Sequence, residues 1–429
     1  MRRLILMAST ALVAACSVQA EEPVAFTGAE IHPVAGDPIE EGVLLLDGDT
    51  ITEVGAVNEV RVPEDAEVID VSGKVIIPGL VDTHSHIADV AGGDGADALH
   101  PGTRALDAID VRSDSARRAW AGGITTANVM PGSGHLMSGQ TAYVKLRPDA
   151  RVIDDWLFCD NPTEDVCGGM KMANGTNPIR DSQPFPGTRA KAAEQVRSLF
   201  AEAEAYREQR EGDDPPSRDL AKEALLQVLD GERTVHHHTH RHDDILTVLR
   251  LADEFGYEPV LHHVSEAWKV PEEIAEAGVA ASIIMIDTPG GKLEAVNLLW
   301  DNAPALEEAG VDTAFHTDDL VTDSRVFLRS AGLGVRAGMS EAGALEALTL
   351  AGARMMGLED RVGSLEPGKD ADFVVLDGPP LAAYTRVLET WVEGEQVFDR
   401  DDPEQREWAT GGTSVFGPGT GAHGHGEQQ

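Results

Sequence analysis

Hydrophobic and polar residues alternate differently in three successive parts of the chain. Residues 24–80 contain short apolar runs bounded by Gly, Pro and Asp, without an apolar period of helical length, and this pattern predicts β-strands. From about residue 79 to 350, short apolar runs alternate with stretches of helical period, which predicts a parallel sheet covered by helices. Residues 361–400 return to strand-like runs. The predicted helices span 192–208, 219–229, 243–255, 270–277, 293–308 and 340–356.

The order of these segments predicts an α/β fold. Strand and helix alternate across residues 79–360, a length that suits a (β/α)₈ barrel. The two strand-rich ends, 24–78 and 361–400, are expected to pair into one small β-sandwich domain beside the barrel. Residues 409–429 are rich in Gly and lack apolar periodicity, so we expect a disordered tail there.

The first twenty residues have the pattern of an export signal. Two Arg residues precede an apolar run from Leu4 to Ala15, which is too short to span a bilayer as a mature helix. Two processing routes remain open: cleavage after Ala20, or lipidation of Cys16, because the residues around Cys16 resemble a lipobox. We therefore expect a periplasmic, extracellular or lipid-anchored outer-membrane protein with no transmembrane segment.

Composition and cysteine content narrow the partners and the environment. The chain of 429 residues has 34 basic and 74 acidic side chains and a formal net charge of −40, which repels the phosphates of nucleic acids. We expect a homo-oligomer. Cys159 and Cys167 are an even pair in the exported part, so one disulfide and two free thiols both remain open.

Histidines at two places provide candidate metal ligands. His84 and His86 follow an apolar run, and side chains two residues apart on a strand project to the same side. Two imidazoles at the carboxyl end of a barrel strand can bind a divalent metal. Residues 236–263 hold seven of the 15 His residues, more than one metal site can use. These seven are His236, His237, His238, His240, His242, His262 and His263.

A carboxylate and a lysine extend this set. Asp318 ends a third predicted strand, where it can ligate a metal and take a proton from bound water. Lys171 lies between two Met residues, and the alternative for it is a side chain that extends along the surface. Lys145 is a second Lys on a predicted strand.

Together these motifs resemble the metal-dependent amidohydrolase superfamily, in particular its imidazolonepropionase-like and prolidase-like members, which are often secreted. The resemblance covers about residues 24–400. The segment Gly73-Lys-Val-Ile-Ile-Pro-Gly-Leu-Val-Asp-Thr-His-Ser-His86 is similar to the family's first barrel strand. Residues 361–376 are similar to the segment that returns the chain to the small β domain, and residues 169–178 to the fourth barrel strand.

The resemblance implies a site for one or two divalent ions, with zinc expected and Mn, Co or Fe as alternatives. The two His residues of the first strand and Asp318 would hold one ion, and one His from each of strands five and six would hold the second. Lys171, carboxylated, would bridge the two ions. We prefer it to Lys145, because a long helical segment and then the His-rich strand follow it, as the order of the family's barrel requires. The implied ligands are His84, His86, Lys171, His238, His263 and Asp318.

The same resemblance implies the chemistry of an amide hydrolase. Water between the ions would lose a proton to Asp318, which would pass it to the leaving nitrogen while the metal polarises the carbonyl. His240, Arg241 and His262 are the candidate contacts to a small-molecule or peptide substrate. We therefore expect a secreted hydrolase that cleaves a C–N bond in a small peptide or cyclic amide.

Two other functions remain as alternatives. An inactive amidohydrolase-like barrel could serve as a binding scaffold, but such proteins lose ligands, and this chain keeps every implied one. A periplasmic His-rich metal-binding protein would use residues 236–263 together with His423 and His425, and it would bind metal weakly, in a graded manner and without hydrolysis.

Overall fold

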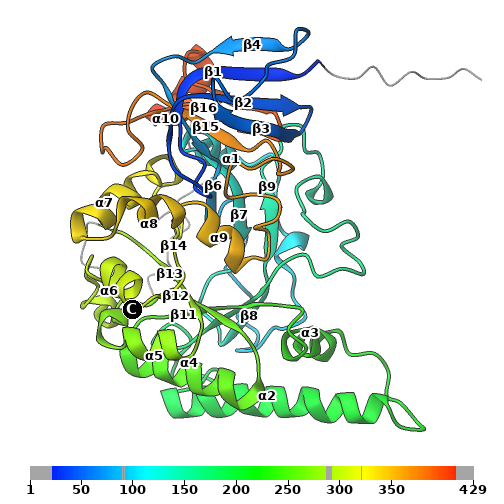
Figure 1. The fold of residues 1–429 in the computed structure, drawn as a ribbon. Helices are drawn as coiled ribbons and strands as arrows, with labels where there is room; N and C mark the ends of the chain where they lie inside the picture. Colours follow the sequence, from blue (N-terminus) through cyan, green and yellow to red (C-terminus); the bar gives the residue numbers. More distant parts are fainter. Residues whose placement is uncertain (1–21, 89, 91, 287–291, 320, 412–429) are drawn as a thin grey trace, which may run out of the picture.

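The computed structural model describes residues 22–88, 90, 92–286, 292–319 and 321–411. Its helices and strands alternate through most of the chain, in agreement with the predicted α/β class. The strands form three sheets. In Figure 1 the sheet built from the two ends of the chain lies at one end of the molecule, and the longest helix lies at the other.

The largest sheet combines strands from both ends of the chain. They are β1 (Val24–Ile31), β2 (Ile39–Asp47), β3 (Thr50–Ala56), β4 (Glu67–Asp70), β5 (Val75–Pro78), β15 (Phe373–Leu376), β16 (Val387–Val392) and β17 (Glu395–Asp399). The strand order is β17-β16-β15-β5-β1-β2-β3, with β4 paired to β1. β5 and β15 pair in antiparallel register, with Val75 opposite Leu376. Phe26, Phe373 and Trp391 pack against one another on this sheet, with Phe26 4.8 Å and 5.0 Å from the other two ring centres.

The other strands form two smaller sheets that carry the candidate ligands. The three-stranded sheet contains β6 (Leu80–Ser85), β7 (Ile124–Val129) and β9 (Ala142–Lys145). The six-stranded sheet contains β8 (Met137–Gln140), β10 (Met170–Ala173), β11 (Val235–Thr239), β12 (Pro259–His263), β13 (Ala280–Ile283) and β14 (Thr313–Phe315). β6 and β7 are parallel, and so are β10 to β14, whereas β8 and β9 run antiparallel to their neighbours. Within each parallel set the carboxyl ends therefore meet at one edge.

The turn between α8 (Glu341–Glu346) and α9 (Leu350–Met355) links the two smaller sheets. The carbonyl of Ala347 accepts a hydrogen bond from the amide of Phe315 on β14, and the carbonyl of Leu348 accepts one from Val81 on β6, at 2.7 Å and 2.9 Å. The single helix predicted over 340–356 is wrong for this reason, because these carbonyls bond to strands instead of to the next helical turn.

Four other predicted helices are confirmed with small shifts of their ends. Polar side chains cap two of them: Thr188 accepts from the Lys191 amide at the start of α2 (Arg189–Arg210), and Asp219 accepts from two amides at the start of α3 (Leu220–Leu229). Besides α8 and α9, the described helices are α1 (Asp114–Ala121), α2 (Arg189–Arg210), α3 (Leu220–Leu229), α4 (His242–Phe255), α5 (Pro271–Glu276), α6 (Asn302–Glu308), α7 (Arg329–Ala337) and α10 (Pro403–Thr410).

Two other predictions, the helix over 293–308 and the start of the tail, differ more from the structure. The helix predicted over 293–308 is reduced to a 3₁₀ turn at Leu293–Ala295 and to α6, and the Asn297 carbonyl between them accepts from the Trp268 indole instead of from a helical amide. The predicted tail from 409 begins too early, because α10 continues to Thr410.

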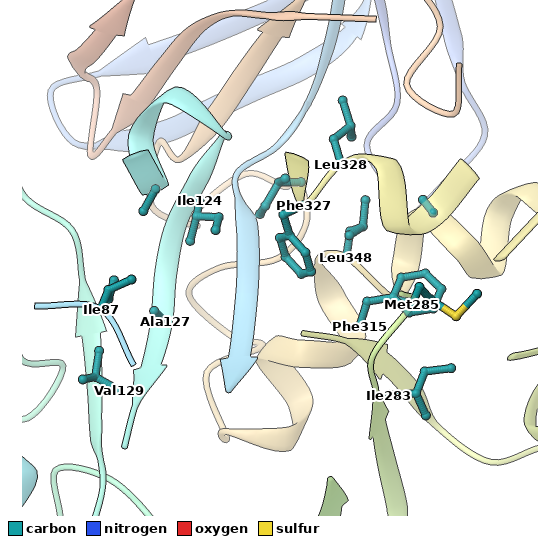
Figure 2. Packing of buried hydrophobic residues seen from close by; sticks show 14 of the residues in the cluster. Ile87, Ile124, Ala127, Val129, Ile283, Met285, Phe315, Phe327, Leu328 and Leu348 are labelled. Atoms are coloured by element: carbon teal, nitrogen blue, oxygen red, sulfur yellow. The ribbon is translucent and has the colours of Figure 1, made fainter. Parts of the chain in front are cut away.

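One apolar core supports strands of both smaller sheets. Figure 2 shows Ile124 and Val129 of β7 in the same cluster as Ile283 of β13 and Phe315 of β14. Each of these four side chains is at most 1% exposed, and Phe327 is also completely buried. The strand ends that form the site are therefore carried by a continuous packed layer.

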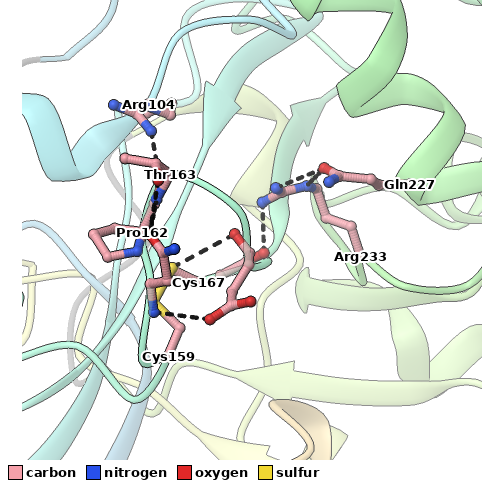
Figure 3. The surroundings of a disulfide bond; sticks show 10 residues. Arg104, Cys159, Pro162, Thr163, Cys167, Gln227 and Arg233 are labelled. Carbon is pink, nitrogen blue, oxygen red and sulfur yellow. Dashed lines mark hydrogen bonds between the residues drawn. A yellow bond between two sulfur atoms is a disulfide. The ribbon is translucent and has the colours of Figure 1, made fainter.

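Cys159 and Cys167 form a disulfide (Figure 3). Of the two alternatives left open by the sequence, the structure has the bonded pair. The closed loop leads directly into Gly168, whose carbonyl accepts a hydrogen bond of 2.7 Å from the guanidinium of Arg233. The disulfide and this hydrogen bond therefore fix the chain just before β10, the strand that carries Lys171.

Several predictions fall outside the described residues. They are the export signal over 1–20, lipidation at Cys16, cleavage after Ala20, and the tail from 412 onward with its two His residues. None of the helices in the described part of the chain is both long and apolar enough to cross a membrane.

Candidate metal centre

The predicted ligands lie at the carboxyl ends of parallel strands. His84 is on β6, Lys171 on β10, His238 on β11 and His263 on β12. His86 follows β6 directly, and Asp318 lies three residues after the end of β14. Because β10, β11 and β12 are neighbours in one sheet, their carboxyl ends lie side by side. The amide of Asp318 donates to the carbonyl of His84 at 2.9 Å, which brings the ends of β14 and β6 together.

His84, His86 and Asp318 form the first group. Oδ1 of Asp318 lies 3.0 Å from Nε2 of His86 and 3.4 Å from Nε2 of His84. Nδ1 of His86 donates to the Met130 carbonyl at 2.7 Å, so in a neutral ring its Nε2 carries the lone pair. The three ligand atoms lie within 4.8 Å of one another. A cation between them would relieve the repulsion between these lone pairs and the carboxylate.

His238, His263 and Lys171 lie beside this group. The rings of His238 and His263 are 4.5 Å apart, and Nε2 of His263 and Nδ1 of His238 are buried without a hydrogen-bond partner in the described part of the protein. Nζ of Lys171 is 3.1 Å from Nε2 of His84. These nitrogens are available to a cation, but among the described residues the ligand atoms within 4.8 Å of one another group His263 with His84 and His316, and His238 with His240 and Glu294.

The backbone explains why His263 joins the cluster. His262 pairs in register with His238, and strand alternation places their side chains on one face, so the next residue should point to the other. His263, however, has a φ of +69°, and Asp318 has a φ of +48°. Non-glycine residues seldom adopt this region, and such strain concentrates at functional sites. The positive φ at the end of β12 turns the His263 ring toward His238.

Burial sets the protonation of these groups. It lowers the pKa of Lys171 from 10.5 to about 7, and it lowers the pKa of His84, His238 and His263 well below 6.5. Burial also raises the pKa of Asp318. When the His86 ring carries both protons, its hydrogen bond to Asp318 and the charges of nearby groups outweigh burial, so this pKa falls below its usual range. Neutral imidazoles and an ionised carboxylate are the forms that metal binding requires.

Two residues at the site were missed by sequence reasoning. Nε2 of His316 lies 3.0 Å from Nδ1 of His263, and its Nδ1 lies 2.7 Å from Oγ of Ser282. The His-x-Asp spacing of His316 and Asp318 repeats the spacing of His84 and His86, and this signal could have identified it. Nζ of Lys292 lies 3.5 Å from Nε2 of His238, and no periodicity marks this lysine in the sequence.

The structure separates the three candidate substrate contacts. His240 is buried, its ring is 4.7 Å from that of His238, and its Nε2 has no partner among the residues described. Arg241 is 41% exposed, pairs with Asp243 at 2.9 Å, and lines an open hollow of about 410 Å³. His262 is completely buried and both of its nitrogens are hydrogen-bonded within the core, which leaves none for a substrate.

Lys145 lies in a different environment from Lys171. Its buried ammonium pairs with Asp370, with Asp372 at 3.1 Å and with Glu393 at 3.4 Å. It thus ties β9 to the segment around β15, and the geometry agrees with the preference for Lys171 as the lysine of the site.

Comparison with known proteins decides the family. The profile of the Amidohydrolase family matches residues 75–397, well over half of the chain. The chain belongs to the amidohydrolase family. This amidohydrolase is 32% identical to an amidohydrolase from Thermotoga maritima, with a TM-score of 0.81 over 88% of this chain and 100% of that one.

Curated relatives extend the comparison. This amidohydrolase is 24% identical to an imidazolonepropionase from Shouchella clausii over 84% of this chain and 86% of the relative. It is 27% identical to the amidohydrolase tasK from Hapsidospora irregularis over 82% of this chain, but it spans only 40% of the length of that relative. The family match and these named relatives place the chain in the amidohydrolase family, whose members include the imidazolonepropionase.

Proposed function

We propose that this amidohydrolase cleaves the C–N bond of a cyclic amide or small peptide at a divalent-metal site. The observation that carries the proposal is the convergence of the Nε2 atoms of His84 and His86 on one oxygen of Asp318, at 3.4 Å and 3.0 Å. Imidazoles with a carboxylate are a donor set that zinc favours. The likeness to an imidazolonepropionase supports a cyclic amide as one substrate class.

The chain's own residues have defined tasks in this reaction. When bound, the metal supplies a Lewis acid that activates water and polarises the scissile carbonyl. Asp318 would accept the proton of that water and deliver it to the leaving nitrogen. The amide of Asp318 is held by the His84 carbonyl, and Asp82 holds the preceding residue by accepting from the Thr317 amide and hydroxyl at 3.0 Å and 2.5 Å. These contacts keep the carboxylate in place.

Lys171 is proposed to bridge two ions after carboxylation. Carbon dioxide reacts with a neutral amine, and burial lowers the pKa of Lys171 to about 7, so much of this side chain is neutral near pH 7. Its position 3.1 Å from His84, on the strand next to that of His238, supports a ligand shared between the two groups.

We also propose that the two smaller sheets form one eight-stranded barrel, in which β8 and β9 are halves of one bent strand. The hydrogen bonds from Phe315 and Val81 to the turn before α9 support closure between β14 and β6. Residues 24–78 and 361–400 would then form the small β domain. The disulfide and the N-terminal pattern support export, with cleavage after Ala20 and lipidation of Cys16 both compatible.

Elemental analysis of the protein, purified without chelator or affinity metal, tests the site. We expect about two equivalents of tightly bound metal if Lys171 bridges, or about one if it does not. Hydrolysis of dipeptides and cyclic imides is then measured on the same sample. The absence of metal after reconstitution with zinc and bicarbonate would overturn the proposal.

A double variant links the metal to turnover. His84→Ala combined with His86→Ala should abolish both tight metal binding and hydrolysis while the circular dichroism spectrum is unchanged. The control is His32→Ala, which removes a histidine that pairs with Glu30 at 2.8 Å on β1, away from the site. Turnover retained in the double variant contradicts the assignment of the ligands.

A further inference from the structure

A chain of hydrogen bonds runs from His84 away from the proposed metal site. Nδ1 of His84 lies 3.2 Å from Nδ1 of His262. Nε2 of His262 lies 2.9 Å from Nδ1 of His236, and Nε2 of His236 lies 2.8 Å from the hydroxyl of Tyr143. The three imidazoles are at most 1% exposed, so their partners are one another and not solvent.

With neutral imidazole rings, all hydrogen bonds in this series must be donated in one direction, from His84 toward Tyr143. A neutral imidazole has one N–H and one lone pair, and a metal bound to His84 through Nε2 leaves the proton on Nδ1. His84 then donates to His262, which must carry its proton on Nε2 and donate to His236. His236 in turn donates from Nε2 to the hydroxyl of Tyr143. Reversing any one ring would set two protons or two lone pairs against each other.

Neighbouring backbone and side chains hold the hydrogen-bonded imidazole rings in place. A Cβ atom at Gly169 would lie only 2.3 Å from Cδ2 of His236 and 2.6 Å from the Thr234 carbonyl, so only glycine lets β10 approach this ring so closely. His236 on β11 is in register with Lys171 on β10, and His262 on β12 is in register with His238 on β11. The rings of His236 and His262 are therefore fixed by neighbouring strands of the same sheet.

We propose that His262, His236 and Tyr143 are positioning residues that hold His84 in the tautomer with its proton on Nδ1, so that its Nε2 lone pair is directed at the metal. The inference rests on the proposed metal site and deepens it. It gives a role to two of the histidines that exceed the number a metal site needs. These residues act through His84 and do not touch the metal.

His237 provides a matched control on the same strand. It is 2% exposed and lies between His236 and His238, yet neither of its ring nitrogens has a partner within the described ranges. Strand alternation turns it to the opposite face, where it lines a pocket with residues of α2 and α4. Its replacement removes an equally buried imidazole without interrupting the chain of hydrogen bonds.

The test measures zinc affinity on the full chain by equilibrium competition with a chromogenic chelator. His262→Leu removes the acceptor for Nδ1 of His84, and loss of such an outer partner weakens metal binding about 10- to 100-fold. His262→Gln offers an amide oxygen to the same N–H and should recover most of the affinity. His236→Leu and Tyr143→Phe should give progressively smaller losses, and His237→Leu should bind zinc as the unmodified protein does.

The outcomes separate this inference from the proposed function. If the unmodified protein binds no zinc, both are overturned. If it binds zinc and hydrolyses amides but His262→Leu has unchanged affinity, only the inference is overturned. Equal losses in His262→Leu and His262→Gln would reduce the role of His262 to packing and also overturn it. If His262→Leu does not fold, unchanged zinc affinity in both His236→Leu and Tyr143→Phe would overturn the inference instead.

Discussion

Replacement of Lys171 by Met should change how the stability of the metal-free protein depends on pH. Lys171 is completely buried, and this burial lowers its pKa from 10.5 in the unfolded chain to about 7. Between these two values the unfolded state binds a proton that the folded state does not. The stability of the unmodified protein therefore rises with pH in this window, and below pH 7 the full penalty of burying the charge is present.

The magnitude follows from these two pKa values. Proton linkage makes the burial of Lys171 cost about 4 kcal/mol at pH 7 and about 1 kcal/mol at pH 9.5. Met has nearly the same length and no charge, so Lys171→Met avoids this cost at both values. Relative to the variant, the unmodified protein should gain about 3 kcal/mol of unfolding free energy between pH 7 and pH 9.5.

Urea unfolding, followed by fluorescence in metal-free and bicarbonate-free buffer, measures this difference. Both proteins are compared at several pH values with the disulfide intact, so that other titrating groups cancel. Parallel stability curves for Lys171→Met and the unmodified protein would refute the reasoning, because they would show that Lys171 keeps its ordinary pKa in the fold.

Three further changes test other parts of the structure. Asp318→Asn keeps the size of the side chain but removes the base, so kcat should fall about 10²- to 10⁴-fold in steady-state assays; an unchanged kcat contradicts the role of Asp318. Cys159→Ser with Cys167→Ser opens a loop with a sequence separation of 8, which should lower the unfolding free energy by about 2–3 kcal/mol in urea titrations. Arg118→Met removes the guanidinium that pairs with the buried Asp319 at 2.7 Å, so the free energy of unfolding should fall by about 3–5 kcal/mol. A melting temperature equal to that of the unmodified protein would show that this pair does not stabilise the fold.

The sequence could predict those parts of the site that depend on local strand geometry. His84 and His86 share a side of the chain because strand residues repeat every two positions, and the structure places them beside Asp318. The order of strand and helix likewise predicted the parallel arrangement of β10 to β14. These features follow from residues close together in the chain.

Other features depend on contacts between distant residues. Strand period alone could not choose between His262 and His263, because the choice is made by the positive φ of His263 at the end of β12. The helix predicted over 340–356 is interrupted by hydrogen bonds to Val81 and Phe315, partners that no local pattern reveals. Lys292 reaches His238 from a position 54 residues later in the chain.

The pairing of β5 with β15 has a consequence for the order of folding. Val75 and Leu376 face each other across this pair, so about 300 residues must be synthesised before β5 gains its second neighbour. An unpaired strand edge can pair with another chain. Until residues 373–376 join the sheet, one edge of β5 is therefore open to aggregation, so the fold is protected only after both ends of the chain have come together.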